Sequence, residues 1–210
     1  MTKGGPKAPF VVSMEHYYVE KPKCELKIKT ATLKLKNGRV YQFQTPSGVF
    51  SFGEIDKATR ILIEHCQVHG KKILDLGCGY GVIGIVLKAE YPDFEVYMSD
   101  INERAVEFAK INARKNNVDV MIKQGAFFEP WKEETFDIIL MNPPLAAGKK
   151  VVQRLIEESF EHLNGGGSLQ VVAYHNKGGT YVKRLMGEIF GNVEDIYKEG
   201  GVRIYKSVKV

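Results

Sequence analysis

Hydrophobic and polar positions follow two different rhythms along this chain. Between Tyr17 and Thr45, apolar residues occupy alternate positions on both sides of Asn37-Gly38, a pair typical of a tight β-hairpin turn. From Asp56 onward, short apolar runs that suit buried strands alternate with segments whose apolar residues recur every three or four positions. The pattern therefore predicts a small hairpin followed by a series of βαβ units.

The expected elements of the second part can be given by residue range. We expect strands at 72–77, 95–100, 118–123, 136–141 and 168–174. We expect helices at 56–68, 82–89, 102–115, 149–163 and 181–190. Residues 164–167 should stop the fourth of these helices, and the last runs, 193–197 and 202–208, should pair antiparallel. These elements predict a Rossmann-like α/β fold with a mostly parallel, doubly wound, seven-stranded sheet that ends in an antiparallel strand.

Length and composition bound the organisation of the chain. Its 210 residues, 44% hydrophobic and 26% charged, suit one globular domain with a small appendage. We divide it into a flexible tail (1–16), a hairpin extension (17–45) and the main domain (46–210). The chain has neither the ~20 consecutive apolar residues of a membrane span nor an apolar signal core, so we expect a cytoplasmic protein without a membrane partner. The three cysteines and five histidines show no paired spacing, and we expect no metal site.

The net charge of +5 mildly favours a polyanionic partner. Much of the positive charge falls in the predicted hairpin, where it could form a basic ribbon. An RNA platform and an ordinary solvated sheet face explain this ribbon equally well. The residues concerned are Lys23, Lys27, Lys29, Lys34, Lys36 and Arg39.

A glycine-rich loop, Asp75-Leu-Gly-Cys-Gly-Tyr-Gly81, follows the first strand of the main domain. It overlaps the G-x-G-x-x-G pattern of dinucleotide sites, but a carboxylate at Asp75 would repel a pyrophosphate there. That carboxylate suits the ammonium group of S-adenosylmethionine, directly or through water. Asp100 ends the next strand, where it would accept hydrogen bonds from two ribose hydroxyls or cap the following helix. The expected cofactor contacts here are Asp75, Gly77, Cys78, Gly79, Tyr80, Gly81, Asp100 and Ile101.

The loop after the third strand, Gly125-Ala-Phe-Phe-Glu-Pro130, should pass the adenine of such a cofactor. Phe127 is a candidate to pack on the adenine ring, although core packing explains Phe127 and Phe128 nearly as well. No acid stands near Ala126 to bind the adenine amine, so the backbone at Ala126 should make that contact.

Asn142-Pro143-Pro144 follows the fourth strand. An aromatic or amide nitrogen is a poor nucleophile because its lone pair is delocalised. If the Asn142 side-chain oxygen and the Pro143 carbonyl each accept one N–H, the lone pair turns toward the methyl donor. Alignment for in-line transfer then supplies most of the rate, and the two prolines stiffen the loop. We therefore expect Asn142, Pro143 and Pro144 to be catalytic, Asn142 also to contact the cofactor, and the reaction to be amino-group methylation.

With these motifs together, the chain resembles a known family. Thr45-Pro-Ser-Gly-Val-Phe-Ser51, the helix near Asp56, the glycine loop, the Asn-Pro-Pro step and Gly201-Val-Arg-Ile-Tyr-Lys206 are similar to the catalytic half of bacterial small-subunit ribosomal RNA guanine-amine methyltransferases. This family is the RsmC type, and the chain also resembles short archaeal relatives of it. The resemblance implies S-adenosylmethionine as cofactor, ribosomal RNA or the small subunit as partner, and a guanine exocyclic amine as acceptor. It also implies a substrate entrance beside Phe50, Phe52 and Leu145.

Two departures from this family leave alternatives open. Bacterial members carry Phe after Asn-Pro-Pro, where a ring can stack on a flipped base, and here Leu145 takes that place. Bacterial members also have a duplicated N-terminal domain with no counterpart in these residues. A glutamine methyltransferase acting on a release factor shares the loop at 125–130, but that class has Tyr after Asn-Pro-Pro. A non-catalytic RNA-binding protein with this fold would have no need for Asp75, Asp100 and Asn142.

Overall fold

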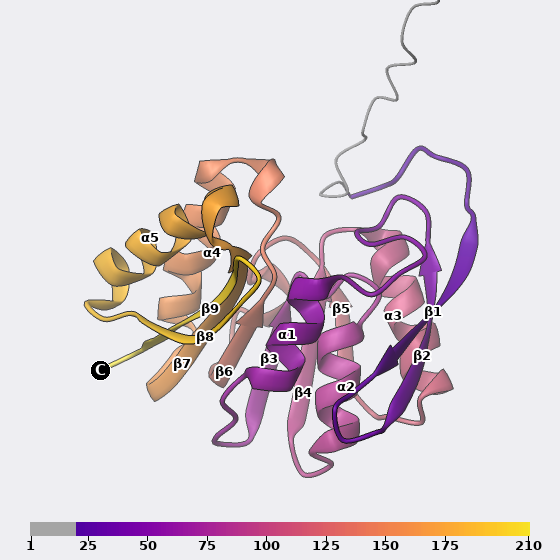
Figure 1. Cartoon of the computed structure of the whole chain (residues 1–210), viewed down its shortest axis with the longest axis horizontal. Helices are drawn as coiled ribbons and strands as arrows, with labels where there is room; N and C mark the ends of the chain where they lie inside the picture. The colour runs from indigo at the N-terminus through magenta and orange to yellow at the C-terminus, as the bar shows by residue number, and fades with distance from the viewer. Residues whose placement is uncertain (1–19) are drawn as a thin grey trace, which may run out of the picture.

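The computed structural model describes residues 20–210, and its centre is a seven-stranded sheet with helices on both faces (Figure 1). Across the sheet the strands are β5 (Met121–Gln124), β4 (Glu95–Asp100), β3 (Lys72–Leu76), β6 (Phe136–Met141), β7 (Leu163–Tyr174), β9 (Val202–Val208) and β8 (Glu194–Glu199). Strands β5, β4, β3, β6 and β7 run parallel to one another, whereas β9 pairs antiparallel with both β7 and β8. This confirms the predicted fold class, with the last strand antiparallel.

The helices divide between the two faces of the sheet because each strand alternates its side chains. Ile73 of β3 belongs to one buried cluster, together with residues of α1 (Lys57–His65), α2 (Val82–Glu90) and α3 (Glu103–Lys115). Its neighbour Leu74 belongs to the other cluster, together with residues of α4 (Lys149–Glu161) and α5 (Thr180–Phe190). Both faces are therefore buried, which explains the nearly continuous apolar runs of these strands.

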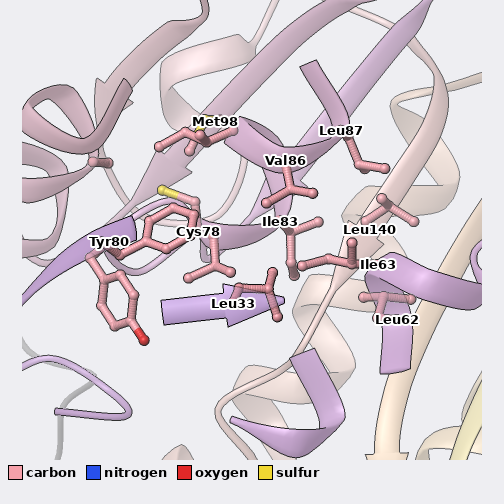
Figure 2. Packing of buried hydrophobic residues seen from close by; sticks show 14 of the residues in the cluster. Leu33, Leu62, Ile63, Cys78, Tyr80, Ile83, Val86, Leu87, Met98 and Leu140 are labelled. Atoms are coloured by element: carbon pink, nitrogen blue, oxygen red, sulfur yellow. The ribbon is translucent and has the colours of Figure 1, made fainter. Parts of the chain in front are cut away.

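The first cluster joins the hairpin to the main sheet. Figure 2 shows its side chains in contact from the hairpin, two helices, the glycine loop and the sheet. Leu62, Val86 and Met98 are 0% exposed, and each such side chain contributes roughly 1.5–3 kcal/mol by burial. The labelled members are Leu33, Leu62, Ile63, Cys78, Tyr80, Ile83, Val86, Leu87, Met98 and Leu140.

The hairpin consists of β1 (Ile28–Lys34) and β2 (Val40–Pro46), which pair antiparallel. Gly38 has φ +88° at the turn, where Leu35 N–H donates to the Arg39 carbonyl at 2.9 Å. The buried side chain of Asn112 in α3 bonds both the N–H and the carbonyl of Gln44, at 2.7 and 2.9 Å. These bonds fix β2 against the main domain. The proposed boundary at 45/46 stays a prediction, and the tail at 1–16 lies outside the described residues.

Several local features differ from the sequence-based expectation, among them the end of α1 at His65, three residues before the expected end at 68. Residues 164–167 are part of β7 rather than a separate helix stop, because Gly166 and Gly167 exchange backbone hydrogen bonds with Lys209. Strand β5 begins only at Met121, three residues later than expected. The turns η1 (Glu129–Trp131), η2 (Leu145–Ala147) and η3 (His175–Gly179) were not expected. Within residues 20–210, no helix has the length and apolar character needed to cross a membrane.

Candidate active site

A cleft opens at the carboxyl ends of β3, β4 and β6, where the strand order changes direction. It encloses about 960 Å³ of empty space, counting the solvent at its mouth. Open α/β sheets bind ligands at such a switch point because the loops on either side diverge there. The cleft is lined by Val49, Phe50, Ser51, Asp56, Thr59, Leu76, Gly77, Cys78, Gly79, Tyr80, Val82, Ile83, Ser99, Asp100, Ile101, Asn102, Gly125, Phe127, Asn142, Pro143, Pro144 and Leu155.

The glycine loop forms the floor of the cleft. Gly77 and Gly79 have φ +74° and +56°, which favour glycine. A Cβ on Gly77 would meet no atom within 4 Å, and one on Gly79 would meet only Val49 at 3.9 Å. Space is therefore left above these two residues for a ligand. Gly81 differs, because a Cβ there would lie 2.8 Å from Ile85, so its lack of a side chain serves packing.

Asp100 stands at the wall of the cleft with its carboxylate oriented by backbone donors. Its Oδ2 accepts from Gly79 N–H at 2.8 Å, and its Oδ1 accepts from Asn102 N–H at 2.8 Å. Burial raises the pKa of Asp100, while these donors lower it. The α3 N-cap is Asn102, whose side chain accepts from Ala105 N–H. Asp100 itself is therefore left in the position expected for a ribose-binding acid.

Asp75 lies directly beneath the floor and is fully buried. Its Oδ2 accepts from Gly84 N–H at 2.9 Å, and its Oδ1 has no partner among the described residues. Burial, with a smaller contribution from nearby Asp100, raises the pKa of Asp75 to about 7, although the Gly84 N–H bond lowers it. Ser99, which lines the cleft, is 1% exposed, and its hydroxyl also has no partner in the described chain.

The segment at 49–54 covers one side of the cleft and is attached to the glycine loop. The Tyr80 hydroxyl donates to the Glu54 carbonyl at 2.7 Å and approaches the Ser51 carbonyl at 3.4 Å. Ser51 has φ +63°, a conformation that is unfavourable for residues other than glycine. Phe50 projects at this edge with 39% of its surface exposed.

Phe127 lines the opposite side and has φ +52°, also in the left-handed region. The Arg154 guanidinium carbon lies 3.9 Å from the centre of its ring. Arg154 pairs with Glu158, which also accepts from Phe128 N–H at 3.3 Å. Helix α4 thus holds this loop against the cleft, with one face of the Phe127 ring against Arg154.

Asn142 follows β6 with both protons of its side-chain amide engaged. Nδ2 donates to Asp56 Oδ2 at 3.1 Å and to Thr59 Oγ1 at 3.0 Å. Because a carboxylate only accepts, this arrangement identifies the nitrogen and leaves Oδ1 on the other side of the amide. Pro144 has φ −75° and ψ 75°, an inverse γ-turn in which Leu145 N–H donates to the Pro143 carbonyl at 2.8 Å. One lone pair of that carbonyl remains.

Most predicted site residues meet in this cleft. The lining contains the predicted catalytic residues Asn142, Pro143 and Pro144, the substrate residue Phe50, and the cofactor residues Gly77, Cys78, Gly79, Tyr80, Asp100, Ile101 and Phe127.

Five predicted residues lie outside the lining. Asp75 is beneath the floor, and Gly81 packs against α2 and β4. Ala126 has its carbonyl bonded to Glu129 N–H. The Phe52 ring lies under the Lys29 ammonium at 4.7 Å from its centre, and Leu145 packs near Gly178.

Sequence reasoning missed Asp56 and Thr59 in the cleft wall. Asp56 carries a recognisable signal as a polar residue directly before an amphipathic helix, and it does cap α1 by accepting from Thr59 N–H at 2.9 Å. Its contact with Asn142 joins residues 86 positions apart, which no local pattern reveals.

The cleft suits S-adenosylmethionine. It offers free space above Gly77 and Gly79, an oriented carboxylate at Asp100, and a buried hydroxyl at Ser99 that has no partner among residues 20–210. Among residues 20–210, no group of three His, Cys, Asp or Glu side chains is arranged to hold a metal ion.

Comparisons of this chain with family models, curated proteins and solved structures all point to methyltransferases. The family model described as the methyltransferase small domain matches residues 40–206. The uncharacterized protein YbxB of Bacillus subtilis (strain 168) is 41% identical over 93% of this chain and 99% of its own length. Ribosomal RNA small subunit methyltransferase C of Pseudomonas entomophila (strain L48) is 32% identical over 94% of this chain and 59% of its own length.

Two solved structures resemble the fold. The Thermus thermophilus 16S rRNA N2 G1207 methyltransferase (RsmC), in complex with AdoMet and guanosine, matches 90% of this chain and 52% of that chain, with a TM-score of 0.77 and 25% identity. A methyltransferase from Pyrococcus furiosus matches 71% of this chain and 80% of that chain, with a TM-score of 0.62 and 26% identity. The chain thus spans little more than half the length of these two RsmC proteins, from Pseudomonas entomophila and Thermus thermophilus. It belongs to the methyltransferase small domain family and is an RsmC-like class I methyltransferase dependent on S-adenosylmethionine.

Proposed function

We propose that this enzyme methylates the exocyclic amine of a guanine in ribosomal RNA of the small subunit. The observation that carries the proposal is the orientation of Asn142, whose amide nitrogen is held by Asp56 and Thr59. Its oxygen is then available to a substrate amine. The printed names of two relatives, a small-subunit rRNA methyltransferase C and an N2 G1207 methyltransferase bound to guanosine, support this substrate class.

The proposed chemistry follows from two acceptors on one short segment. Asn142 Oδ1 and the remaining lone pair of the Pro143 carbonyl would each accept one N–H of a primary amine. Two such bonds turn the nitrogen lone pair away from the aromatic ring and toward the cofactor. The γ-turn at Pro144 keeps the two acceptors in a stiff relation, so little reorganisation is needed during the reaction.

The cofactor would be held by the glycine loop and its neighbours. S-adenosylmethionine, when bound, supplies an electrophilic methyl group on a sulfonium. We propose that Asp100 accepts from its ribose hydroxyls, Phe127 packs against adenine on the face opposite Arg154, and Gly77 and Gly79 allow close backbone approach. We propose that Phe50, exposed at the rim, stacks on a flipped base, since Leu145 offers no ring.

The test is label transfer from tritiated S-adenosylmethionine to three acceptors in parallel: unmodified small-subunit rRNA, assembled small subunits and purified release factor. Nucleoside analysis should find N2-methylguanosine in the RNA or subunit samples. Asn142→Ala should keep cofactor affinity but reduce the single-turnover rate by at least ~100-fold, because a preorganised contact to the reacting amine is lost. Label only as methylglutamine in release factor would replace the RNA proposal with a protein-glutamine substrate.

A further inference from the structure

We propose that Asp56 is the positioning residue of this reaction: it holds the Asn142 amide so that Oδ1 faces the substrate amine. This rests on the proposed function, in which that oxygen accepts a substrate N–H. Asp56 would act entirely through Asn142, from the start of a helix distant in sequence.

Three hydrogen bonds link Asp56, Thr59 and Asn142 to one another. Asp56 Oδ2 accepts from Thr59 N–H at 2.9 Å and from Asn142 Nδ2 at 3.1 Å. Thr59 Oγ1 accepts from the same Nδ2 at 3.0 Å. Turning the amide by 180° would place Asn142 Oδ1 against the Asp56 carboxylate, which has no proton to donate, and would lose that bond; the Thr59 hydroxyl could donate to the oxygen instead, so the carboxylate sets the orientation. The amide therefore has one favoured orientation.

The negative charge of Asp56 makes its hydrogen bond with the Asn142 amide stronger than a bond to a neutral acceptor would be. The carboxylate sits at the N-terminus of α1, where the helix dipole favours a negative charge. A hydrogen bond to an ionised acceptor is roughly twice as strong as one between neutral groups. It also polarises the amide and places more electron density on Oδ1, which improves that oxygen as an acceptor for the amine.

A capping role alone would also explain an Asp at this position, and substitutions can separate the two roles. Serine caps helices about as well as aspartate, but its shorter side chain cannot bridge to Asn142. Asparagine keeps both the cap and an acceptor oxygen at the same distance, without the charge. Thr59→Val removes the hydroxyl acceptor and preserves the shape of the side chain. Thr30→Val, on the exposed face of the hairpin, is a matched control for hydroxyl removal.

The experiment compares these variants by single-turnover methylation of an unmodified small-subunit rRNA transcript, cofactor and transcript affinity, and ¹⁵N spectra of the Asn142 amide. We expect Asp56→Ser to lower the rate by at least ~30-fold with both affinities within about twofold, because only transition-state alignment is lost. Asp56→Asn should lose distinctly less, Thr59→Val should lose several-fold, and Thr30→Val should match the wild type. The two Asn142 amide protons should shift toward free-amide positions in Asp56→Ser.

Either of two results would overturn the role of Asp56. One is a folded Asp56→Ser enzyme that keeps more than half of the wild-type rate, and the other is an Asn142 amide signal that the substitution leaves unchanged. If Asp56→Ser does not fold, Asp56→Asn and Thr59→Val decide by the same readouts. If the wild type labels no RNA, the proposed substrate is wrong, and the amide spectra still decide whether Asp56 orients Asn142.

Discussion

The hydroxyl of Tyr80 donates a 2.7 Å hydrogen bond to the backbone carbonyl of Glu54, and so ties the glycine loop to the segment that covers the cleft. Tyr80 is 4% exposed, and burial raises the pKa of its phenol well above the ordinary value. The phenol therefore remains protonated, and a donor, at neutral pH. One bond thereby joins the cofactor floor to the proposed substrate entrance.

Tyr80→Phe should lower the free energy of unfolding by about 0.5–1.5 kcal/mol, because the bond from the buried Tyr80 hydroxyl is lost while the Glu54 carbonyl keeps the Ser51 hydroxyl as a donor. It should also weaken S-adenosylmethionine binding several-fold, since the cover of the cleft is no longer held. Urea denaturation and calorimetry measure the two effects. Tyr91→Phe, at a tyrosine with 42% exposure, is the control and should change unfolding by less than ~0.5 kcal/mol. Equal effects of the two substitutions would show that the Tyr80 bond has no role in holding the cleft.

The order of strands and helices could be predicted from the sequence, because a sheet that is buried on both faces requires apolar residues at nearly every position of its strands. The runs around β3 and β6 are apolar on both faces, and α3 repeats its apolar residues at helical spacing. The glycine loop, Asp100 and Asn142 could be placed together because parallel strands end at one edge. Local pattern and overall topology agree at these positions.

Other features depend on contacts that the sequence does not display. The Asp56–Asn142 bond forms only when the start of α1 meets the end of β6. The position of Asp75 below the floor depends on Gly84 and the start of α2. A left-handed phenylalanine at Phe127 is contrary to backbone preference and is held in place by Arg154 and its partner. In all three, contacts between residues distant in sequence fix the observed geometry, so the local sequence pattern does not reveal it.

The buried acid Asp75 predicts a pH dependence of stability. Its pKa is raised from 3.8 to about 7, so the folded state binds more protons than the unfolded state between these values. Stability from this group is therefore present at low pH and is lost as the pH rises from about 4 to about 7. Asp75→Asn removes the titration. The unfolding free energy of this variant, relative to wild type, should increase by roughly 2–4 kcal/mol between pH 4 and pH 8.

Denaturant unfolding of the cofactor-free protein across this pH range measures the difference between the two proteins. Taking the difference cancels the contributions of the surface acids, which both proteins share. A difference that stays constant from pH 4 to pH 8 would show that Asp75 does not titrate with a raised pKa.

Asp100→Ala should weaken S-adenosylmethionine binding by at least about tenfold. A carboxylate accepting from hydroxyl groups contributes roughly 1.5–3 kcal/mol, and the Gly79 N–H loses its partner at the same time. Isothermal calorimetry with the cofactor and with its demethylated product should show the same loss, since both carry the ribose. A loss confined to one of these ligands would place Asp100 away from the ribose. The variant should also lose part of the rise in melting temperature that ligand binding causes.

The last prediction concerns the basic hairpin, which the structure separates into two regions. Lys29 lies over the Phe52 ring, next to the segment that lines the cleft. At the turn end, Lys36 and Arg39 pair with Glu64 and Glu90. Lys34 borders a shallow surface that also contains Glu64 and Glu199. The positive field for a nucleic acid should therefore concentrate near Lys27 and Lys29, which face no acid in any described ion pair.

We expect Lys27→Gln with Lys29→Gln to weaken binding of a small-subunit rRNA transcript and to reduce the slope of log affinity against log salt by about 1.5–2, because each phosphate contact releases condensed counterions. Lys34→Gln with Lys36→Gln removes the same net charge and is the matched control, for which we expect less than half of this change. Cofactor affinity should stay unchanged in both proteins, since neither pair lines the cleft. Equal slopes in the two double variants would mean that net charge alone attracts the RNA. An unchanged slope in both would make the hairpin an ordinary solvated sheet, with the RNA bound elsewhere on the protein.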